Sequence, residues 1–163
     1  MIVLKRNYFL LFKGNKFRCS IGKNGIRRSK NEGDCCTPTG KFGLGPIYFR
    51  KDKITRLKTK IKTFPITKNM FWEDNPIKKN YNKLSFNNKK SSEKLFRKDN
   101  IYDIIVVINY NTKPVIPEKG SAIFIHIAKN NYMPTRGCIA LKKKDLIFMI
   151  SKLSRKEKIL ITF

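Results

Sequence analysis

The sequence is poor in histidine and in acidic residues. Its 163 residues include one histidine, His126, and 11 aspartates and glutamates against 37 lysines and arginines. The four cysteines, Cys19, Cys35, Cys36 and Cys138, do not form the paired CxxC or HxxxH spacings that hold zinc. Cys35 and Cys36 are adjacent, which suits neither a chelate nor a mutual disulfide. We therefore expect no metal and no other cofactor.

Long apolar runs are also missing. No stretch approaches the ~20 apolar residues of a membrane-spanning helix, so no membrane span is expected. The apolar stretch Tyr8–Phe12 is shorter than the roughly 7–15 residues of a signal-peptide core, and no small-residue cleavage site follows it. It is better interpreted as a strand. Repeats of fixed period and Pro/Gly/Ser linkers are absent as well, so the sequence predicts a single domain over residues 1–163.

The excess of basic residues gives a formal net charge of +26. Such a charge invites an anionic partner, such as nucleic acid, an anionic membrane or an acidic wall polymer. The basic residues nevertheless run from Lys5 to Lys158 without gathering in one element, whereas a nucleic-acid-binding module concentrates them. Lysine, asparagine and isoleucine are all abundant, as in an A/T-rich coding sequence. Coding bias is the favoured explanation, and nucleic acid is not an expected partner.

Short β-branched and aromatic runs dominate the rest of the pattern. They predict a mainly β fold, a sandwich or partly closed barrel, with one helix near the C-terminus and a few short helical turns. Strands are expected at 3–11 and 16–21 (a hairpin closed near Gly14-Asn15), within 37–44, and at 61–66, 104–108, 122–128, 138–141 and 158–163. Residues 142–154 have helical period, because Leu146, Met149, Ile150 and Leu153 recur on one face. One helical turn, capped by Ser91, is expected at 91–96.

His126 and Cys138 stand out because two short strands would bring them together. Alternation puts His126 on the same strand face as Phe124, and Gly137 permits a sharp turn just before the thiol. Taken singly, His126 could be a hydrogen-bonded core histidine and Cys138 a buried structural thiol. On strands joined by the loop 129–134, however, they predict an imidazole beside a thiol. That arrangement generates a thiolate nucleophile near neutral pH, and the backbone amides of the turn can point at a developing oxyanion.

The surrounding motifs resemble those of the YkuD family of L,D-transpeptidases. The resemblance rests on GSAIF-x-H, here Gly120–Phe124 and His126, followed by PT-x-GC-x-AL, here Pro134–Leu141. It extends through nearly the whole chain and includes the segments 32–34, 37–42, 48–52, 72–76, 81–82, 102–103 and 110–111. Separated motifs in one order are more specific than a lone Cys–His pair.

This resemblance implies an acyl-enzyme mechanism on peptidoglycan stem peptides. The Cys138 thiolate would attack the carbonyl at the L-centre of a diamino acid, D-Ala would leave with a proton from His126, and an amine of a second stem would accept the acyl group. The resemblance also implies that the Ile127 carbonyl orients the imidazole, that the Gly137 and Cys138 amides bind the oxyanion, and that carbapenems inhibit. It places the protein in the cell envelope. Because no clear signal peptide is seen, the sequence leaves the cytoplasm open.

Two departures from the family bear on substrate binding. Many members have His where Arg136 stands and Arg where Ala140 stands. Arg136 could therefore grip a substrate carboxylate, and the alternative is a solvent-facing arginine on a loop. Further substrate-binding candidates are Trp72, Asp74, Tyr81 and Asn82, with core packing as the alternative for the two aromatics.

Three functions are thus in competition. L,D-transpeptidation is the prediction. A carboxypeptidase or amidase would use the same Cys138 and His126 with water as the acceptor. A non-catalytic basic module would bind wall polymer or nucleic acid with steep salt dependence.

Overall fold

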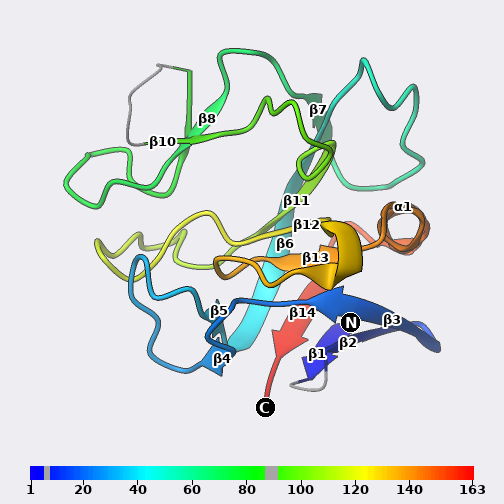
Figure 1. Cartoon of the computed structure of the whole chain (residues 1–163), viewed down its shortest axis with the longest axis horizontal. Helices are drawn as coiled ribbons and strands as arrows, with labels where there is room; N and C mark the ends of the chain where they lie inside the picture. Colours follow the sequence, from blue (N-terminus) through cyan, green and yellow to red (C-terminus); the bar gives the residue numbers. More distant parts are fainter. Residues whose placement is uncertain (6–7, 87–91) are drawn as a thin grey trace.

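One large β-sheet that closes on itself makes up most of the fold (Figure 1). The computed structural model describes residues 1–5, 8–86 and 92–163. Within these residues the strands of the large sheet pair in the order β11 (Ile104–Ile108), β12 (Phe124–Ile127), β13 (Ile139–Leu141), β3 (Asn15–Ser20), β2 (Phe9–Phe12), β1 (Ile2–Lys5), β14 (Lys158–Ile161), β6 (Gly40–Phe49) and β7 (Thr63–Pro65). A further pairing between β11 and β6 closes the sheet into a barrel. The fold is mainly β, as predicted, and of the two predicted architectures, sandwich and barrel, the structure has the barrel.

The long strand β6 links two parts of this barrel. It pairs antiparallel with β14 over Gly40–Gly43 and with β11 over Leu44–Phe49, and it is the long cyan strand of Figure 1. The register with β11 shifts near the end of this pairing, and such irregularities bend a strand. Gly45 lies at the bend, where a Cβ would come within 2.8 Å of Asn109 Oδ1.

The N-terminal segment forms three strands where the sequence predicts a two-stranded hairpin. β1 pairs antiparallel with β2, and β2 pairs antiparallel with β3. The prediction of one strand over 3–11 is wrong because the backbone of Tyr8 is left-handed, with φ 63°, a conformation that no strand continues. Residues 6 and 7 of that range lie outside the described residues. The hairpin with β3 is confirmed, with Phe12 opposite Asn15 across the Gly14 turn.

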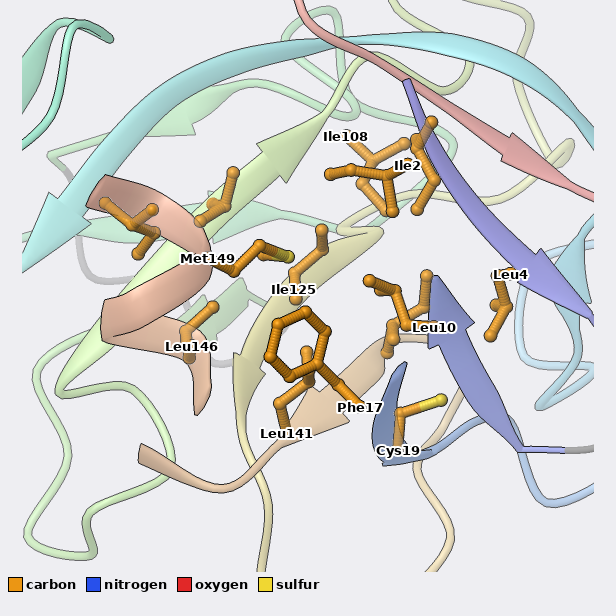
Figure 2. Close-up of a cluster of buried hydrophobic side chains, with 14 of the residues drawn as sticks. Ile2, Leu4, Leu10, Phe17, Cys19, Ile108, Ile125, Leu141, Leu146 and Met149 are labelled. Carbon is orange, nitrogen blue, oxygen red and sulfur yellow. The ribbon is translucent and has the colours of Figure 1, made fainter. Parts of the chain in front are cut away.

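Aliphatic side chains fill the main core, and a helix covers one side of it (Figure 2). Helix α1 (Lys143–Lys152) buries Leu146, Met149 and Ile150. Figure 2 shows Leu146 and Met149 directed toward Ile125 of β12. The helix predicted from the spacing of these residues is confirmed. Full burial of a side chain of this size stabilises the fold by about 1.5–3 kcal/mol.

A second apolar cluster lies between the barrel and a small sheet. The small sheet consists of β8 (Phe71–Glu73), β9 (Leu84–Ser85) and β10 (Ser92–Lys94), with β8 in the middle. Trp72 of β8 and Tyr102 both make edge-to-face contacts with Phe124 of β12. The helical turn predicted at 91–96 is wrong for residues 92–94, because their backbone groups pair with β8. Ser91, the predicted cap, lies outside the described residues.

Short elements complete the described fold. β4 (Ile26–Arg27) and β5 (Thr37–Pro38) form a parallel pair, and a short 3₁₀ turn, η1 (Asn130–Tyr132), lies between β12 and β13. The strands expected at 61–66, 104–108, 122–128, 138–141 and 158–163 are confirmed, most with shorter bounds. In the part of the chain that the structure describes, no helix has the length and apolar character needed to cross a membrane.

Candidate active site

Strands β12 and β13 bring His126 and Cys138 to one side of the sheet. The strands pair in parallel, with His126 opposite Ala140, and Cys138 directly precedes β13. Ile125 and Ile127 belong to the main core, so alternation turns His126 the other way, toward the second cluster, which contains Cys138. The predicted placement of both side chains on neighbouring strands is confirmed.

Both side chains line one cavity of about 940 Å³, a size at the upper end of the roughly 300–1,000 Å³ of ligand pockets. The wall of this cavity carries charges of both signs. Its acidic lining residues are Glu32, Asp74 and Glu93, and its basic ones are Lys30, Arg97, Lys129 and Arg136. A ligand that carries both carboxylate and ammonium groups would find partners here.

The Cys138 side chain is buried, and two backbone groups hold its thiol. Sγ donates to the carbonyl oxygen of Ala122 at 3.1 Å and accepts from the amide of Phe124 at 3.4 Å. Burial raises the pKa of the thiol to about 12, and the Phe124 amide opposes that shift because it favours the thiolate. At neutral pH the resting side chain is therefore a neutral thiol.

The His126 ring is also buried and is fixed by a carbonyl and an aromatic ring. Its Nδ1 lies 2.9 Å from the carbonyl oxygen of Ile127, the contact that the resemblance implies. The ring of Tyr102 packs edge-on against it, with centroids 5.4 Å apart. Burial lowers the pKa of His126 to about 4, against the opposing effect of the Ile127 bond. Since a carbonyl can only accept, the neutral imidazole carries its proton on Nδ1 and leaves Nε2 as the base.

Gly137 supplies the turn before Cys138. Its φ of 134° favours glycine, and a Cβ would lie 2.8 Å from the carbonyl oxygen of Cys36. The Gly137 carbonyl accepts from Thr37 Oγ1 at 2.9 Å, and its amide donates to Thr135 Oγ1 at 3.1 Å. The amide predicted to bind an oxyanion thus has a partner at rest, and oxyanion binding would require Thr135 to release it.

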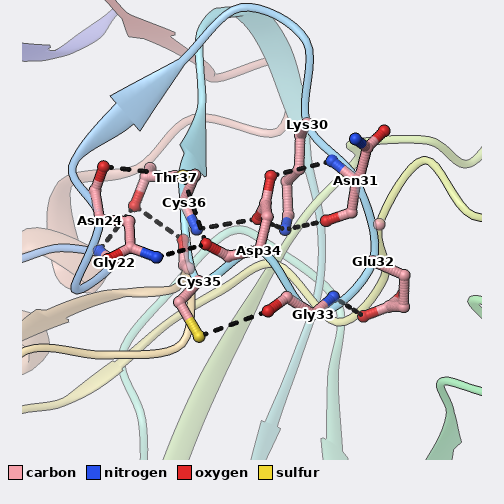
Figure 3. A network of polar contacts seen from close by, with 12 residues as sticks. Gly22, Asn24, Lys30, Asn31, Glu32, Gly33, Asp34, Cys35, Cys36 and Thr37 are labelled. Atoms are coloured by element: carbon pink, nitrogen blue, oxygen red, sulfur yellow. Dashed lines mark hydrogen bonds and ion pairs between the residues drawn. The ribbon is translucent and has the colours of Figure 1, made fainter.

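A polar network within residues 22–37 supports this turn (Figure 3). Lys30, which is 3% exposed, forms an ion pair with Asp34 at 2.6 Å, and Asp34 Oδ1 also accepts from the Cys36 amide. Thr37 connects the network to the Gly137 carbonyl. From the sequence alone, residues 32–34 look like the start of a turn. The hydrogen bond from Thr37 to Gly137 could not be predicted, because it joins two residues 100 positions apart.

A comparison with known families decides where this chain belongs. The family model of the L,D-transpeptidase catalytic domain, YkuD, matches residues 1–161. The chain belongs to this family. No curated protein matches the chain at a significant level.

Two solved structures are similar to this YkuD-family chain. An L,D-transpeptidase from Mycobacterium smegmatis is 13% identical, with a TM-score of 0.45, and the match covers 98% of this chain and 57% of that chain. The helical cell shape determining protein Pgp2 from Campylobacter jejuni is 16% identical, with a TM-score of 0.46, and the match covers 98% of this chain and 46% of that chain. The chain thus spans about half the length of these two structures.

The predicted substrate-binding residues of this YkuD domain fall into two groups. Asp74 and Arg136 line the cavity, whereas Trp72, Tyr81 and Asn82 are not part of its lining. The latter three are buried beside it, and Trp72 packs in the second cluster, as the core-packing alternative has it. This arrangement does not favour direct contact between these three side chains and a substrate.

Asp74 is the acidic member of the predicted group. Burial raises the pKa of its carboxyl to about 6, and the negative charge of Glu93 adds to the effect. Arg136, in contrast, is exposed and lines the cavity from the turn before Cys138. Asp74 and Arg136 therefore offer opposite charges to a ligand in the same cavity.

Three further cavity residues escaped the sequence analysis. Glu93 and Arg97 form an ion pair at 3.3 Å, and Tyr102 lines the same cavity beside His126. Tyr102 lies in a segment that resembles the family, which was the only signal in the sequence. Glu93 gave none, because it reaches the cavity from β10, where the sequence predicted a helical turn.

Across residues 1–5, 8–86 and 92–163, no group of three or more His, Cys, Asp or Glu side chains is placed to hold a metal ion. The four cysteines are free thiols.

Proposed function

We propose that this chain is a cysteine acyltransferase that cross-links peptidoglycan stem peptides by L,D-transpeptidation. Family membership supports the substrate class. The observation that carries the proposal is that Cys138 and His126 line one cavity of ligand size. Cys138 would be the nucleophile, and His126 the general base and acid.

Acylation has to create the thiolate, because both groups are neutral at rest. His126 Nε2 takes the proton of Cys138 as the thiol leaves the Ala122 carbonyl. The thiolate adds to the carbonyl carbon at the L-centre of the donor stem, and amides of the Gly137 turn stabilise the oxyanion. When the carbonyl re-forms, the C–N bond breaks and D-Ala leaves with the proton from His126. The product of this half-reaction is a thioester on Cys138.

Deacylation uses the same two residues in reverse. An amine of a second stem attacks the thioester, His126 takes the proton of the amine, and the departing Cys138 thiolate recovers it. A new amide bond then links the two stems. With water as the acceptor, the same steps give a free carboxylic acid, which is the carboxypeptidase or amidase reaction.

The charged wall of the cavity suits a stem peptide, which carries carboxylates and an amine. We propose that Arg136 binds a donor carboxylate, since a guanidinium can hold both of its oxygens. Asp74 and Glu93 supply negative charge for an ammonium group. Trp72, Tyr81 and Asn82 are given no direct substrate contact.

Incubation of the pure protein with donor and acceptor stems, followed by mass spectrometry, tests the reaction. We expect cross-linked dimers and free D-Ala with the wild type, and neither with folded Cys138→Ser or His126→Ala. Trimmed monomers without dimers would assign the chain to the hydrolases. Salt-sensitive binding of wall polymer that persists in Cys138→Ser, without any turnover in the wild type, would assign it to the binding modules.

Acylation by a carbapenem tests the nucleophile separately. Peptide mapping after brief exposure should find one adduct, on Cys138, and its formation should slow sharply in His126→Ala. Cys19 is an internal control, because burial raises its pKa to about 12 as well while its side chain lies in the main core. Cys35 is the stricter control, because it lines the same cavity. An adduct on Cys35 with Cys138 unmodified contradicts the assignment.

The substrate class places the proposed site of action in the cell envelope. The net charge of +26 would speed the approach to an anionic wall polymer. Fractionation of cells that express the tagged chain checks this, and the envelope fraction is the expected one.

A further inference from the structure

The segment Gly120–Ala122, which holds the resting thiol, has an unusual backbone conformation. Gly120 has φ 95° and Ala122 has φ 51°. A left-handed conformation costs a residue with a Cβ about 1–2 kcal/mol, so Ala122 keeps it only if its surroundings hold it there. Ala122 also supplies the carbonyl that accepts the Cys138 thiol at 3.1 Å.

The side chain of Asn82 holds Ala122. Its Oδ1 accepts from the Ala122 amide at 3.1 Å and from Trp72 Nε1 at 2.9 Å. Its Nδ2 donates to the carbonyl oxygens of Tyr110 and Asn111 at 3.0 and 2.7 Å. These four bonds use both amide hydrogens and both lone pairs of the oxygen. Since Asn82 is 4% exposed, its orientation is fixed.

The neighbouring residue, Tyr81, secures the other end of the segment. Its hydroxyl accepts from the Gly120 amide at 3.0 Å and donates to Glu32. Ser121 Oγ donates to the same Glu32 carboxylate at 2.7 Å. Tyr81 and Asn82 thus hold alternate amides of the segment, while Glu32 holds the side chain between them.

We propose that Asn82 is a positioning residue of the Cys138 site, which acts through Ala122 and does not touch the substrate. The amide and the carbonyl of Ala122 are related by its own φ and ψ. At φ 51° sterics confine ψ of a residue with a Cβ to the small left-handed region, so a held amide also restrains the direction of the carbonyl. The carbonyl in turn sets where the thiol rests before its proton passes to His126. This inference rests on the proposed role of Cys138 as nucleophile.

The test variant is Asn82→Gly. Asn82 itself has φ 57°, and glycine adopts that conformation freely, so the change removes the amide group without backbone strain. We expect faster hydrogen exchange at the Ala122 amide and faster alkylation of Cys138 by iodoacetamide at neutral pH, because the thiol is released from its acceptor. Carbapenem acylation should instead slow by about tenfold or more, because the sulfur is no longer held at the reacting position.

Two further variants separate positioning from simple loss of stability. Ile66→Val removes one methylene from the second apolar cluster, in which Trp72 also packs. It should leave the rates of Cys138 alkylation and carbapenem acylation unchanged. Asn82→Asp keeps the oxygen that accepts from Ala122, but its second oxygen faces the carbonyl oxygens of Tyr110 and Asn111, so it should recover only part of the acylation rate that Asn82→Gly loses. Rates are compared under conditions where all four proteins are folded.

The outcomes distinguish this inference from the proposed function. If Asn82→Gly matches Ile66→Val in Ala122 exchange and in Cys138 alkylation, Asn82 does not position the site, whatever the activity. If exchange and alkylation change as expected but even the wild type forms no carbapenem adduct on Cys138, the positioning stands and the proposed nucleophile is wrong.

Discussion

The main core and the site support are held together by different kinds of interaction. The main core consists of apolar side chains, most of them aliphatic and most of them from the barrel strands and α1, and nearly all are almost fully buried. The site support, by which we mean the polar groups of residues 30–37, 81–82 and 120–122, relies on hydrogen bonds and one buried ion pair. Apolar burial has no direction, whereas a hydrogen bond weakens steeply with angle.

This difference separates what stabilises the fold from what sets the geometry of the site. A lost methyl group in the main core should lower the free energy of unfolding while the surviving folded molecules keep their activity. A lost hydrogen bond in the site support should change the position of a reacting group at a smaller cost in stability. His126 and Cys138 lie between the two regions. Ile125 and Ile127 of β12 pack in the main core, while the Cys138 thiol donates to the carbonyl oxygen of Ala122 in the site support.

The largest effect is expected in the main core. Leu146→Ala should lower the free energy of unfolding by about 3 kcal/mol, because Leu146 is fully buried and truncation leaves a cavity. The kcat/KM of the folded fraction should stay unchanged. Denaturant titration and stem-peptide turnover at low temperature measure the two quantities. Lys144→Ala, at an exposed position of the same helix, is the control. A matching fall in kcat/KM would remove the distinction between the two regions.

The pH dependence of stability should show that His126 is buried as a neutral imidazole. Its pKa is about 4 in the folded protein against an ordinary 6.5. Between these values the unfolded chain binds a proton that the folded chain does not, so stability falls as pH drops from 6.5 to 4. The total loss from this residue is about 3 kcal/mol.

His126→Gln isolates that contribution, because the chain has no other histidine. Burial raises the pKa of Asp74 to about 6, so Asp74 adds stability as pH falls through the same range. This contribution is present in both proteins and cancels when wild type and variant are compared. As pH drops from 6.5 to 4.5, denaturant titrations should show that the free energy of unfolding changes less favourably in the wild type than in the variant, by about 2 kcal/mol. Equal differences for both proteins would contradict the lowered pKa of His126.

A hydrogen bond in the site support is expected to have an intermediate effect. Thr37→Val keeps the shape but leaves the Gly22 amide and the Gly137 carbonyl without their partner. The free energy of unfolding should fall by about 2 kcal/mol, as is usual for an unpaired buried polar group. Carbapenem acylation of Cys138 should slow several-fold in the folded protein. Thr39→Val is the control, and equal acylation rates for the two variants would show that the Gly137 turn needs no such support.

The smallest effect on stability should accompany a clear effect on binding. Arg136→Ala removes an exposed side chain at the cavity rim, so the free energy of unfolding should change by less than about 0.5 kcal/mol. The kcat/KM for stem peptides should fall about tenfold, mainly through KM, equivalent to about 1.4 kcal/mol. Arg136→Lys should recover only part of this, since an ammonium cannot grip both carboxylate oxygens. Arg155→Ala, at an exposed position away from the cavity, controls for net charge. Unchanged kcat/KM in Arg136→Ala would remove Arg136 from the substrate-binding residues.

The elements that the sequence predicts best are those with a strong local pattern. The β-branched run at 104–108 became β11 with the same bounds, and the helical spacing of Leu146, Met149 and Ile150 became α1. The predictions failed where local signals were weak or misleading. Tyr8 breaks the N-terminal strand through its backbone conformation, and residues 92–94 joined the edge of β8 rather than a helical turn.

By itself, the sequence determined the mainly β class, the helix, and the side of the sheet that His126 faces, because alternation and helical period are properties of neighbouring residues. Only the tertiary structure decided that the sheet closes, that Asn82 reaches Ala122, and that Thr37 reaches Gly137. These contacts join residues 40 to 100 positions apart in the chain. They depend on how the barrel brings distant loops to one end of β12 and β13, which no local pattern encodes.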